Sequence, residues 1–224
     1  MGSVTSLLHR EVYVMSQVDR LLSLGTGTAR RWIDGYQRQK RRYEPLVRHA
    51  STGSDTVTWG EFVEARLISE YRSRGVSIAR MRPAIMALRR EFGTEYPLAA
   101  AQPFLSDDGR DIVLRVQEET ALSPSLRFVV RTGQNVMPSM EVQRFQQDAE
   151  YDHDEVRRLR LLGTSNVVLD PEYGFGEPTI RGRRLRVSAV AEALATGEPR
   201  EDIKRIWSLS DVAVDDAVRC SLVA

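Results

Sequence analysis

Arginines gather in the N-terminal third of the chain, where their chemistry suits nucleic acid. Between His9 and Arg48 there are nine basic residues against four acidic ones, although the whole chain has a net charge of only +1. Lys40 and Lys204 are the only lysines, so nearly every positive charge is a planar guanidinium that can form paired hydrogen bonds to phosphate or guanine. This uneven distribution predicts a nucleic-acid contact in the first third of the chain.

Two short helices joined by a tight turn are predicted to position these arginines. Apolar residues follow the spacing of one helix face in 16–22 and again in 29–36, and Gly25 and Gly27 interrupt the pattern between them. Trp32 and Tyr36 belong to the second apolar face, so we expect Trp32 in the core. The second helix should turn its polar residues outward as groove contacts, and these are Thr28, Arg30, Arg31 and Asp34.

A run of four basic residues follows the second helix, and it consists of Arg38, Lys40, Arg41 and Arg42. Such a run is either a solvated face or a set of phosphate contacts, and both interpretations stay open. After it we expect an extended piece up to Arg48, a loop over 51–55 and a strand from Val57, which together would form a small hairpin wing.

No enzyme chemistry is predicted. The chain offers no nucleophile with an adjacent base, no glycine-rich phosphate loop, no metal-ligand spacing and no cofactor motif. Carboxylates and a histidine cluster over 148–155, including Asp152 and Asp154, and could suggest a metal centre, but a solvated acidic loop is the simpler interpretation. Cys220 lies on the apolar side of the last helix, so a buried inert thiol is expected.

The remaining patterns predict a mainly α fold with small β-hairpins. Thr58 and Glu61 have the spacing of a capping box, which predicts a helix that should stop at 75–77. The next helix should be capped by Ser77, unless it begins at Pro83, and it should end at Gly93. Asp108-Gly109 between apolar runs predicts a hairpin over 104–114, followed by a strand at 126–131 and a polar helix or loop at 140–151. Three helices are expected near 188–196, 199–206 and 211–222, with Pro199 in a first turn and Asp211 as a cap.

Three units follow from these patterns: a winged helix-turn-helix over 1–96, a central hairpin and linker segment over 97–163, and a C-terminal three-helix, helix-turn-helix-like domain over 164–224. No apolar run approaches the ~18 residues of a membrane-spanning helix, and the start of the chain lacks the features of a signal peptide. We therefore expect a cytoplasmic protein with no membrane contact.

The order of helix pair, basic wing and second helix pair resembles the MerR-type DNA-binding domain. The residues that carry this resemblance are 18–22 and 28–32 for the first pair and 62–68 and 75–82 for the second. The resemblance implies operator DNA as a partner and a homodimer that reads a two-fold site.

The C-terminal segment is similar to a small three-helix domain common in VapB-like antitoxins, whose partner toxins resemble PIN-domain ribonucleases. The similarity rests on Gly-x-Pro-x-Ile-x-Gly over 176–182, on 185–187 and on 195–198, with Arg183 in place of the threonine usual in the family. It implies a type II antitoxin that neutralises such a ribonuclease and represses its own operon. Arg181, Arg183, Arg184 and Arg186 are candidates for a toxin contact, for a second DNA contact or for a plain basic loop. The acidic surface with Asp152 and Asp154 is the other candidate toxin contact.

The alternative is a MerR-like regulator that senses a small molecule. Regulators of that kind normally dimerise through a long helix after the DNA-binding domain, whereas 97–135 are predicted to form strands and loops. This difference favours the antitoxin.

Overall fold

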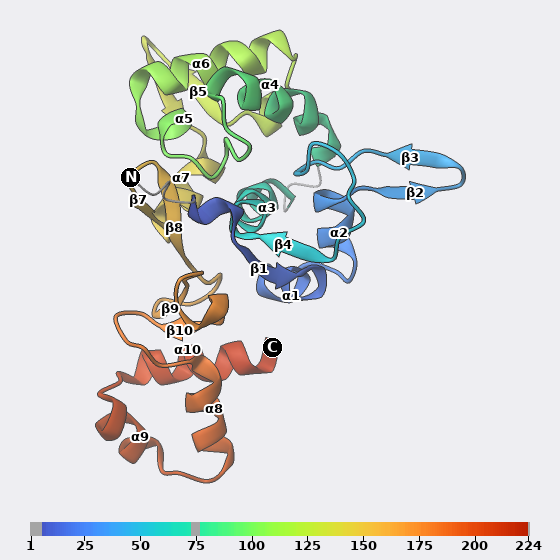
Figure 1. The fold of residues 1–224 in the computed structure, drawn as a ribbon. Coiled ribbons are helices and arrows are strands. Elements are labelled where there is room, and N and C mark those ends of the chain that lie inside the picture. Colours follow the sequence, from blue (N-terminus) through green and yellow to red (C-terminus); the bar gives the residue numbers. More distant parts are fainter. Residues whose placement is uncertain (1–5, 73–76, 224) are drawn as a thin grey trace, which may run out of the picture.

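The computed structural model describes residues 6–72 and 77–223. Helices predominate, and the sheets are small and antiparallel (Figure 1), which confirms the predicted fold class. The helix stop predicted at 75–77 falls partly outside the described residues. Within them, no helix has the length and apolar character needed to cross a membrane.

The N-terminal part centres on one long helix. Its elements are η1 (Leu7–His9), β1 (Glu11–Val14), α1 (Met15–Leu21), α2 (Thr28–Ile33), β2 (Tyr36–Arg38), β3 (Arg41–Tyr43), β4 (Thr56–Thr58) and α3 (Trp59–Arg72). The capping box is present, because Thr58 Oγ1 accepts from the Glu61 N–H at 3.2 Å and Glu61 Oε2 accepts from the Thr58 N–H at 2.9 Å. Nearly all of α3 is buried, so this helix forms the centre of the core.

The next helix begins where proline allows it to begin. A 3-10 turn, η2 (Ile78–Met81), precedes α4 (Arg82–Phe92), which has Pro83 in its first turn, and Gly93 ends α4 with a left-handed φ of 60°. Of the two starts that the sequence left open, the one at Pro83 is therefore correct.

The hairpin predicted over 104–114 is wrong. This segment forms α5 (Gln102–Leu105) and α6 (Asp107–Glu119), and Ser106 caps α6 by accepting from the Gly109 N–H at 3.0 Å. Asp107 and Asp108 belong to the first turn of α6, where acidic residues interact favourably with the helix dipole. Gly109 serves a close approach of the two helices, since a Cβ there would lie 1.9 Å from the Gln102 carbonyl oxygen.

The rest of the central segment is folded into the same core as the N-terminal part. It contains η3 (Pro124–Leu126), β5 (Val129–Thr132), β6 (Asn135–Pro138), α7 (Met140–Asp148), β7 (Ala149–Asp152) and β8 (Glu155–Arg160). One hydrophobic cluster runs from Leu8 to Leu169, and the Trp59 indole N–H donates to the Val156 carbonyl oxygen at 2.6 Å. The predicted boundary between 96 and 97 therefore lies inside a single core.

The C-terminal part has a smaller core of its own. Its elements are β9 (Val167–Leu169), η4 (Gly174–Gly176), β10 (Thr179–Ile180), α8 (Val187–Ala195), α9 (Arg200–Trp207) and α10 (Asp211–Val223), close to the helices expected. Ser210, one residue before the expected Asp211, caps α10 through its side chain. Cys220 is buried in this core as predicted. The sheet β10-β9-β8-β7 joins the smaller core to the larger one.

Gly176 fixes the C-terminal part against β1. Its carbonyl oxygen accepts from the Tyr13 hydroxyl at 2.7 Å, and a Cβ at this position would lie 2.3 Å from Val12 Cγ1. The backbone of Gly176 also has a φ of +78°. The first glycine of the Gly-x-Pro-x-Ile-x-Gly motif is thus required both by its conformation and by the close approach of β1.

Gly176→Ala should destabilise the protein more than Gly182→Ala. Gly182 has a similar φ of +71°, but a Cβ there would meet nothing within 4 Å. Both variants incur backbone strain of about 1 kcal/mol, and only Gly176→Ala adds a clash that typically costs about 1–3 kcal/mol more. Urea unfolding of the two variants measures the difference; equal midpoints would show that the β1 contact contributes nothing.

Candidate nucleic-acid interface

A carboxylate of α1 holds the start of α2. Gly27, before α2, has a left-handed φ of 73° and no side chain to cap the helix. Asp19 supplies the cap instead, because its carboxylate accepts from the Gly27 N–H at 2.6 Å and from the Ala29 N–H at 2.7 Å. Since Asp19 belongs to α1, these bonds also fix the two helices relative to each other.

The basic run forms an exposed β-hairpin. Strands β2 and β3 pair through a two-residue turn in which Gln39 and Lys40 have φ values of 49° and 62°, as in a type I′ turn. Tyr36 and Tyr43 stack across the strands with ring centroids 4.5 Å apart. In Figure 1 the hairpin extends away from the body of the molecule, next to α2. Arg38, Lys40, Arg41 and Arg42 therefore lie on a projecting arm.

The predicted wing was in the wrong place. The loop over 51–55 does not connect a hairpin, because β4 pairs with β1. Tyr36 was expected on the apolar face of the second helix, but α2 ends at Ile33 and Tyr36 begins β2. Gly35 causes this change of direction, since it has a φ of +77° and a Cβ there would lie 2.5 Å from the Tyr43 carbonyl oxygen. Trp32, by contrast, is buried as predicted.

Of the four groove contacts predicted on α2, Arg31 is exposed and Arg30 is partly exposed. Arg30 pairs with Asp55 and its side chain is 42% exposed, while Arg31 donates to Thr28 Oγ1 at 2.8 Å. Thr28 and Asp34 are only 1% and 4% exposed, so the expectation that they face outward is wrong. Helical periodicity assigned them to the polar face, but α2 has fewer than two turns and both of its ends are buried.

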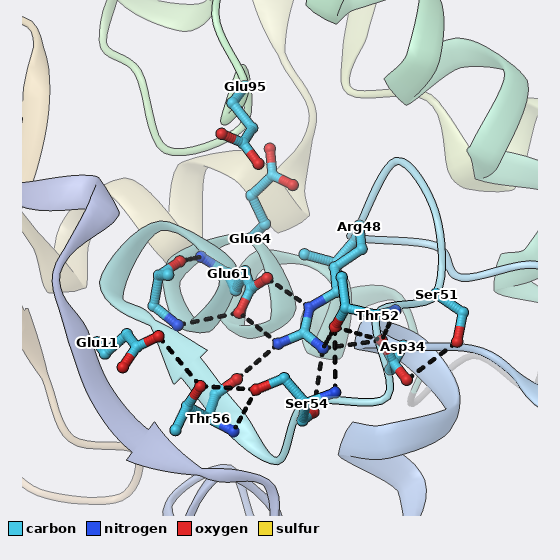
Figure 2. A network of polar contacts seen from close by, with 12 residues as sticks. Glu11, Asp34, Arg48, Ser51, Thr52, Ser54, Thr56, Glu61, Glu64 and Glu95 are labelled. Atoms are coloured by element: carbon cyan, nitrogen blue, oxygen red, sulfur yellow. Dashed lines mark hydrogen bonds and ion pairs between the residues drawn. The ribbon is translucent and has the colours of Figure 1, made fainter.

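Asp34 belongs to a buried ionic network around Arg48 (Figure 2). The Arg48 guanidinium donates to Asp34 Oδ1 at 2.8 Å and to Glu61 Oε1 at 2.6 Å, and it also binds the carbonyl oxygens of Ser54 and Thr56. Asp34 in turn accepts from the backbone N–H groups of Thr52 and Gly53. The network therefore joins the end of α2, the 51–56 loop and the start of α3. Sequence reasoning identified Glu61 as a helix cap and missed its ionic partner.

The network controls the ionisation of Asp34. Burial alone would raise the pKa of this carboxyl group, but hydrogen bonds from Thr52, Arg48, Gly53 and Ser51 outweigh burial and lower the pKa to about 2. Burial also opposes the charge of Arg48, yet its bonds to Glu61 and Asp34 raise the pKa of the guanidinium. Both groups are therefore charged at neutral pH, as a closed ionic network requires.

The four arginines predicted as toxin contacts have different partners in the fold, and one of them reaches the acidic stretch. Arg181 donates to Glu150 of β7 at 2.6 Å, and Arg186 lies 3.2 Å from Glu177. Arg183 donates to the Ser208 carbonyl oxygen, and Arg184 lies over the ring of Tyr173. Arg181 thus lies next to the acidic β7 strand, part of the stretch that the sequence treated as an alternative surface.

The acidic stretch 148–155 runs from the end of α7 through strand β7 and the turn after it to the first residue of β8. Asp148 lies between Arg66 and Arg160, and Asp152 lies 3.3 Å from Arg157, whereas Asp154 is exposed in the turn. Within the part of the chain that the structure describes, no three His, Cys, Asp or Glu residues gather as metal ligands. The carboxylates of the stretch mostly form ion pairs with arginines.

The comparisons with known proteins define a family. The chain belongs to the same family as the uncharacterized protein Rv2308 of Mycobacterium tuberculosis, to which it is 39% identical over 223 residues, covering 96% of this chain and 92% of the relative. A second protein of that organism, named "Putative antitoxin VapB45", is 26% identical over 223 residues, and the alignment covers 92% of this chain and 92% of that relative.

Two further similarities concern the domain and the fold. Residues 167–219 match the family model described as a protein of unknown function, DUF433. The crystal structure of Rv2018 from Mycobacterium tuberculosis has the same fold, with a TM-score of 0.75 at 24% sequence identity, covering 95% of this chain and 100% of that one.

Asp34→Asn should lower the free energy of unfolding at neutral pH, and the free energy of unfolding of the variant should fall less as the pH is lowered. The lowered pKa means that ionised Asp34 stabilises the fold fully above its ordinary pKa of 3.8, and this contribution is lost as the pH falls toward about 2. The shift corresponds to about 2.5 kcal/mol at pH 7 and to about half of that at pH 3. Urea unfolding of both proteins at pH 7 and pH 3 should show the gap shrinking.

Asp55→Asn is the matched control, because Asp55 is on the same loop with its side chain 59% exposed. Its stability should follow that of the unchanged protein at both pH values. A gap for Asp34→Asn that is the same at both would contradict the role assigned to this carboxylate.

Proposed function

We propose that this protein is the antitoxin of a toxin–antitoxin pair, and that it represses its own operon by binding DNA. The similarity to a relative named as an antitoxin, which extends over nearly the whole chain, carries the antitoxin half of the proposal. The DNA-binding half rests on the exposed arginines of α2 and the cationic hairpin beside it. The proposed action includes no enzymatic reaction and takes place in the cytoplasm.

The geometry suits DNA because the cationic groups lie on elements whose positions are fixed. Asp19 holds the start of α2 and the Arg48 network holds its end, so Arg30 and Arg31 are presented with little freedom. We assign these two arginines to base contacts and the hairpin residues Arg38, Lys40, Arg41 and Arg42 to phosphates. Thr28 and Asp34 are buried, and their role is to support α2. A homodimer would present two such surfaces to a two-fold operator.

The structure removes one reason for rejecting a ligand-sensing regulator, namely the absence of a helix after the predicted DNA-binding domain. The segment that was expected to form strands and loops contains the 13-residue helix α6. The apolar residues of α6 pack in the main core, however, as Val113 and Val116 do, so this helix does not present an unpaired apolar face for dimerisation. The antitoxin is preferred because of the named relative.

Replacing Arg30 and Arg31 with alanine should weaken binding to operator DNA and leave binding to random DNA less affected. A well-formed bidentate base contact contributes about 1–3 kcal/mol of discrimination. Arg41→Gln with Arg42→Gln should weaken binding to both DNAs alike and reduce the salt dependence, because phosphate contacts release counterions without reading sequence. Fluorescence anisotropy at several salt concentrations measures both effects.

Arg115→Gln is the control for these variants, since Arg115 is an exposed arginine of α6 that pairs with Glu91. It should bind DNA as the unchanged protein does. If the folded Arg30/Arg31 variant keeps its full preference for the operator, α2 is not the reading helix.

The toxin surface that we propose is the loop before α8 that contains Arg181, Arg183, Arg184 and Arg186, which we call the arginine loop. A PIN-like active site is a carboxylate cluster, which guanidinium groups can occupy through paired hydrogen bonds. Arg181 and Arg186 form exposed ion pairs, which typically contribute only about 0–1 kcal/mol and can exchange partners at little cost. Arg183 and Arg184 are bound to a carbonyl oxygen and an aromatic ring, and among the residues that the structure describes no carboxylate forms an ion pair with either. The acidic turn with Asp152 and Asp154 is the second candidate surface.

Arg183→Ala with Arg184→Ala, in the full chain, should abolish rescue of cells that express the toxin of the neighbouring gene while leaving operator binding intact. The full chain is needed because the main core spans the 96/97 boundary and a fragment would lose part of it. Asp152→Asn with Asp154→Asn tests the acidic turn in the same assay. Rescue that survives the arginine substitutions and fails in the acidic variant would move the toxin surface to the β7–β8 turn.

A further inference from the structure

A cleft of about 590 Å³ lies between α1 and the C-terminal part. It is lined by residues of α1, of the segment before β9, of η4 and of α8 and α10. Its volume falls within the range of sites that hold small organic molecules, roughly 300–1,000 Å³. None of the residues assigned to DNA or to the toxin lines it.

The walls of the cleft are mostly apolar, and two guanidinium groups line it. The apolar side chains are Leu21, Leu161, Leu162, Phe175, Val187 and Ala191. Arg20 comes from α1 and Arg219 from α10, so the two charges belong to the two parts of the chain that the cleft separates. This combination of an apolar interior with a few charged groups is typical of sites that orient an amphipathic ligand.

The charge around the cleft favours an anion. In residues 6–72 and 77–223 no carboxylate pairs with Arg20, and Arg219 is bound to the Gly163 carbonyl oxygen at 2.6 Å. Arg219 also forms a long ion pair of 3.7 Å with Asp216 Oδ1, and the other oxygen of this carboxylate accepts from the N–H groups of Ser165 and Asn166. Glu177, the acidic residue of the lining, is paired with Arg186. Arg20 therefore has no acidic partner among the described residues, and the exposed guanidinium of Arg219 is engaged by a carboxylate only through one long ion pair, so both can bind a further negative charge.

Two features of the backbone add to this preference. Val187 and Ser188, in the first turn of α8, line the cleft, and the N-terminal end of a helix favours negative charge. Phe175 is 77% exposed and has a φ of 56°, a strained conformation for a non-glycine residue. An exposed ring at the edge of an apolar cleft provides a surface that the body of a ligand can cover.

We propose that this cleft binds a small carboxylic acid with an apolar body. The carboxylate lies between Arg20 and Arg219, and the apolar body fills the space between Leu21, Leu161 and Phe175. Such a ligand contacts α1 and the C-terminal part at the same time, so its binding stabilises their present arrangement. The proposal rests on the cleft alone and does not require the proposed DNA or toxin binding.

Octanoate is the probe, with octan-1-ol as its uncharged analogue, and isothermal titration calorimetry of the full chain measures binding. We expect one octanoate per chain, and an affinity about tenfold lower when Arg20→Gln and Arg219→Gln are combined, which corresponds to about 1.4 kcal/mol. Octan-1-ol should bind the unchanged protein no more tightly than octanoate binds the double variant. Ala191→Trp should block the site by filling it.

Arg205→Gln is the control, because Arg205 is an exposed arginine of α9 that pairs with Asp202 and does not line the cleft. It should leave octanoate binding unchanged, and circular dichroism confirms that each variant is folded. No detectable binding up to about 10 mM octanoate would overturn the proposal. An affinity that the arginine double variant leaves unaltered would overturn it as well, and this second result does not depend on Ala191→Trp folding correctly.

Discussion

The buried guanidinium of Arg48 is the contact on which the N-terminal surface depends. It is surrounded by the carboxylates of Asp34 and Glu61 and by two carbonyl oxygens, so the ends of α2, of the 51–56 loop and of the 56–58 strand meet at one side chain. A buried charge that loses its partner typically costs about 3–5 kcal/mol, so these elements can separate only together. Segments too short to be stable alone are made rigid in this way.

A second carboxylate, that of Asp19, completes this arrangement at the other end of α2. Helix α2 is six residues long, and isolated helices of that length do not form in water. The buried carboxylates of Asp19 and Asp34 hold its two ends and so provide the stabilisation that a longer helix would obtain from packing. The exposed arginines consequently project from a short element that its neighbours hold in place.

The sequence predicted the periodic parts of the fold well and the short parts poorly. The capping box of Thr58 and Glu61, the end of a helix at Gly93 and the three C-terminal helices follow from local rules, and the structure contains them. Asp108-Gly109 failed as a turn signal because Ser106 caps a helix there and Gly109 allows two helices to touch. Contacts with distant residues decided that segment, and no local pattern records them.

In the candidate site, too, the features visible in local sequence were predicted and those that depend on distant contacts were not. Sequence reasoning found the exposed cations of α2 and of the basic run, because charge and spacing are visible along the chain. It placed Asp34 outside and missed Arg48, since their pairing joins residues 14 positions apart through a loop without periodicity. The cleft was also missed, because Arg20 and Arg219 approach it from opposite ends of the chain.

The unequal size of the two hydrophobic cores has a consequence for how the chain loses its structure. The C-terminal core is small and is attached to the larger one mainly through strands β8 and β9, with Val167 in the smaller core and Leu169 in the larger. Small cores bury less apolar surface per residue and open more readily than large ones. We expect amide hydrogen exchange to be faster in α8 to α10 than in α3, so partial opening would release the arginine loop while the main core remains folded.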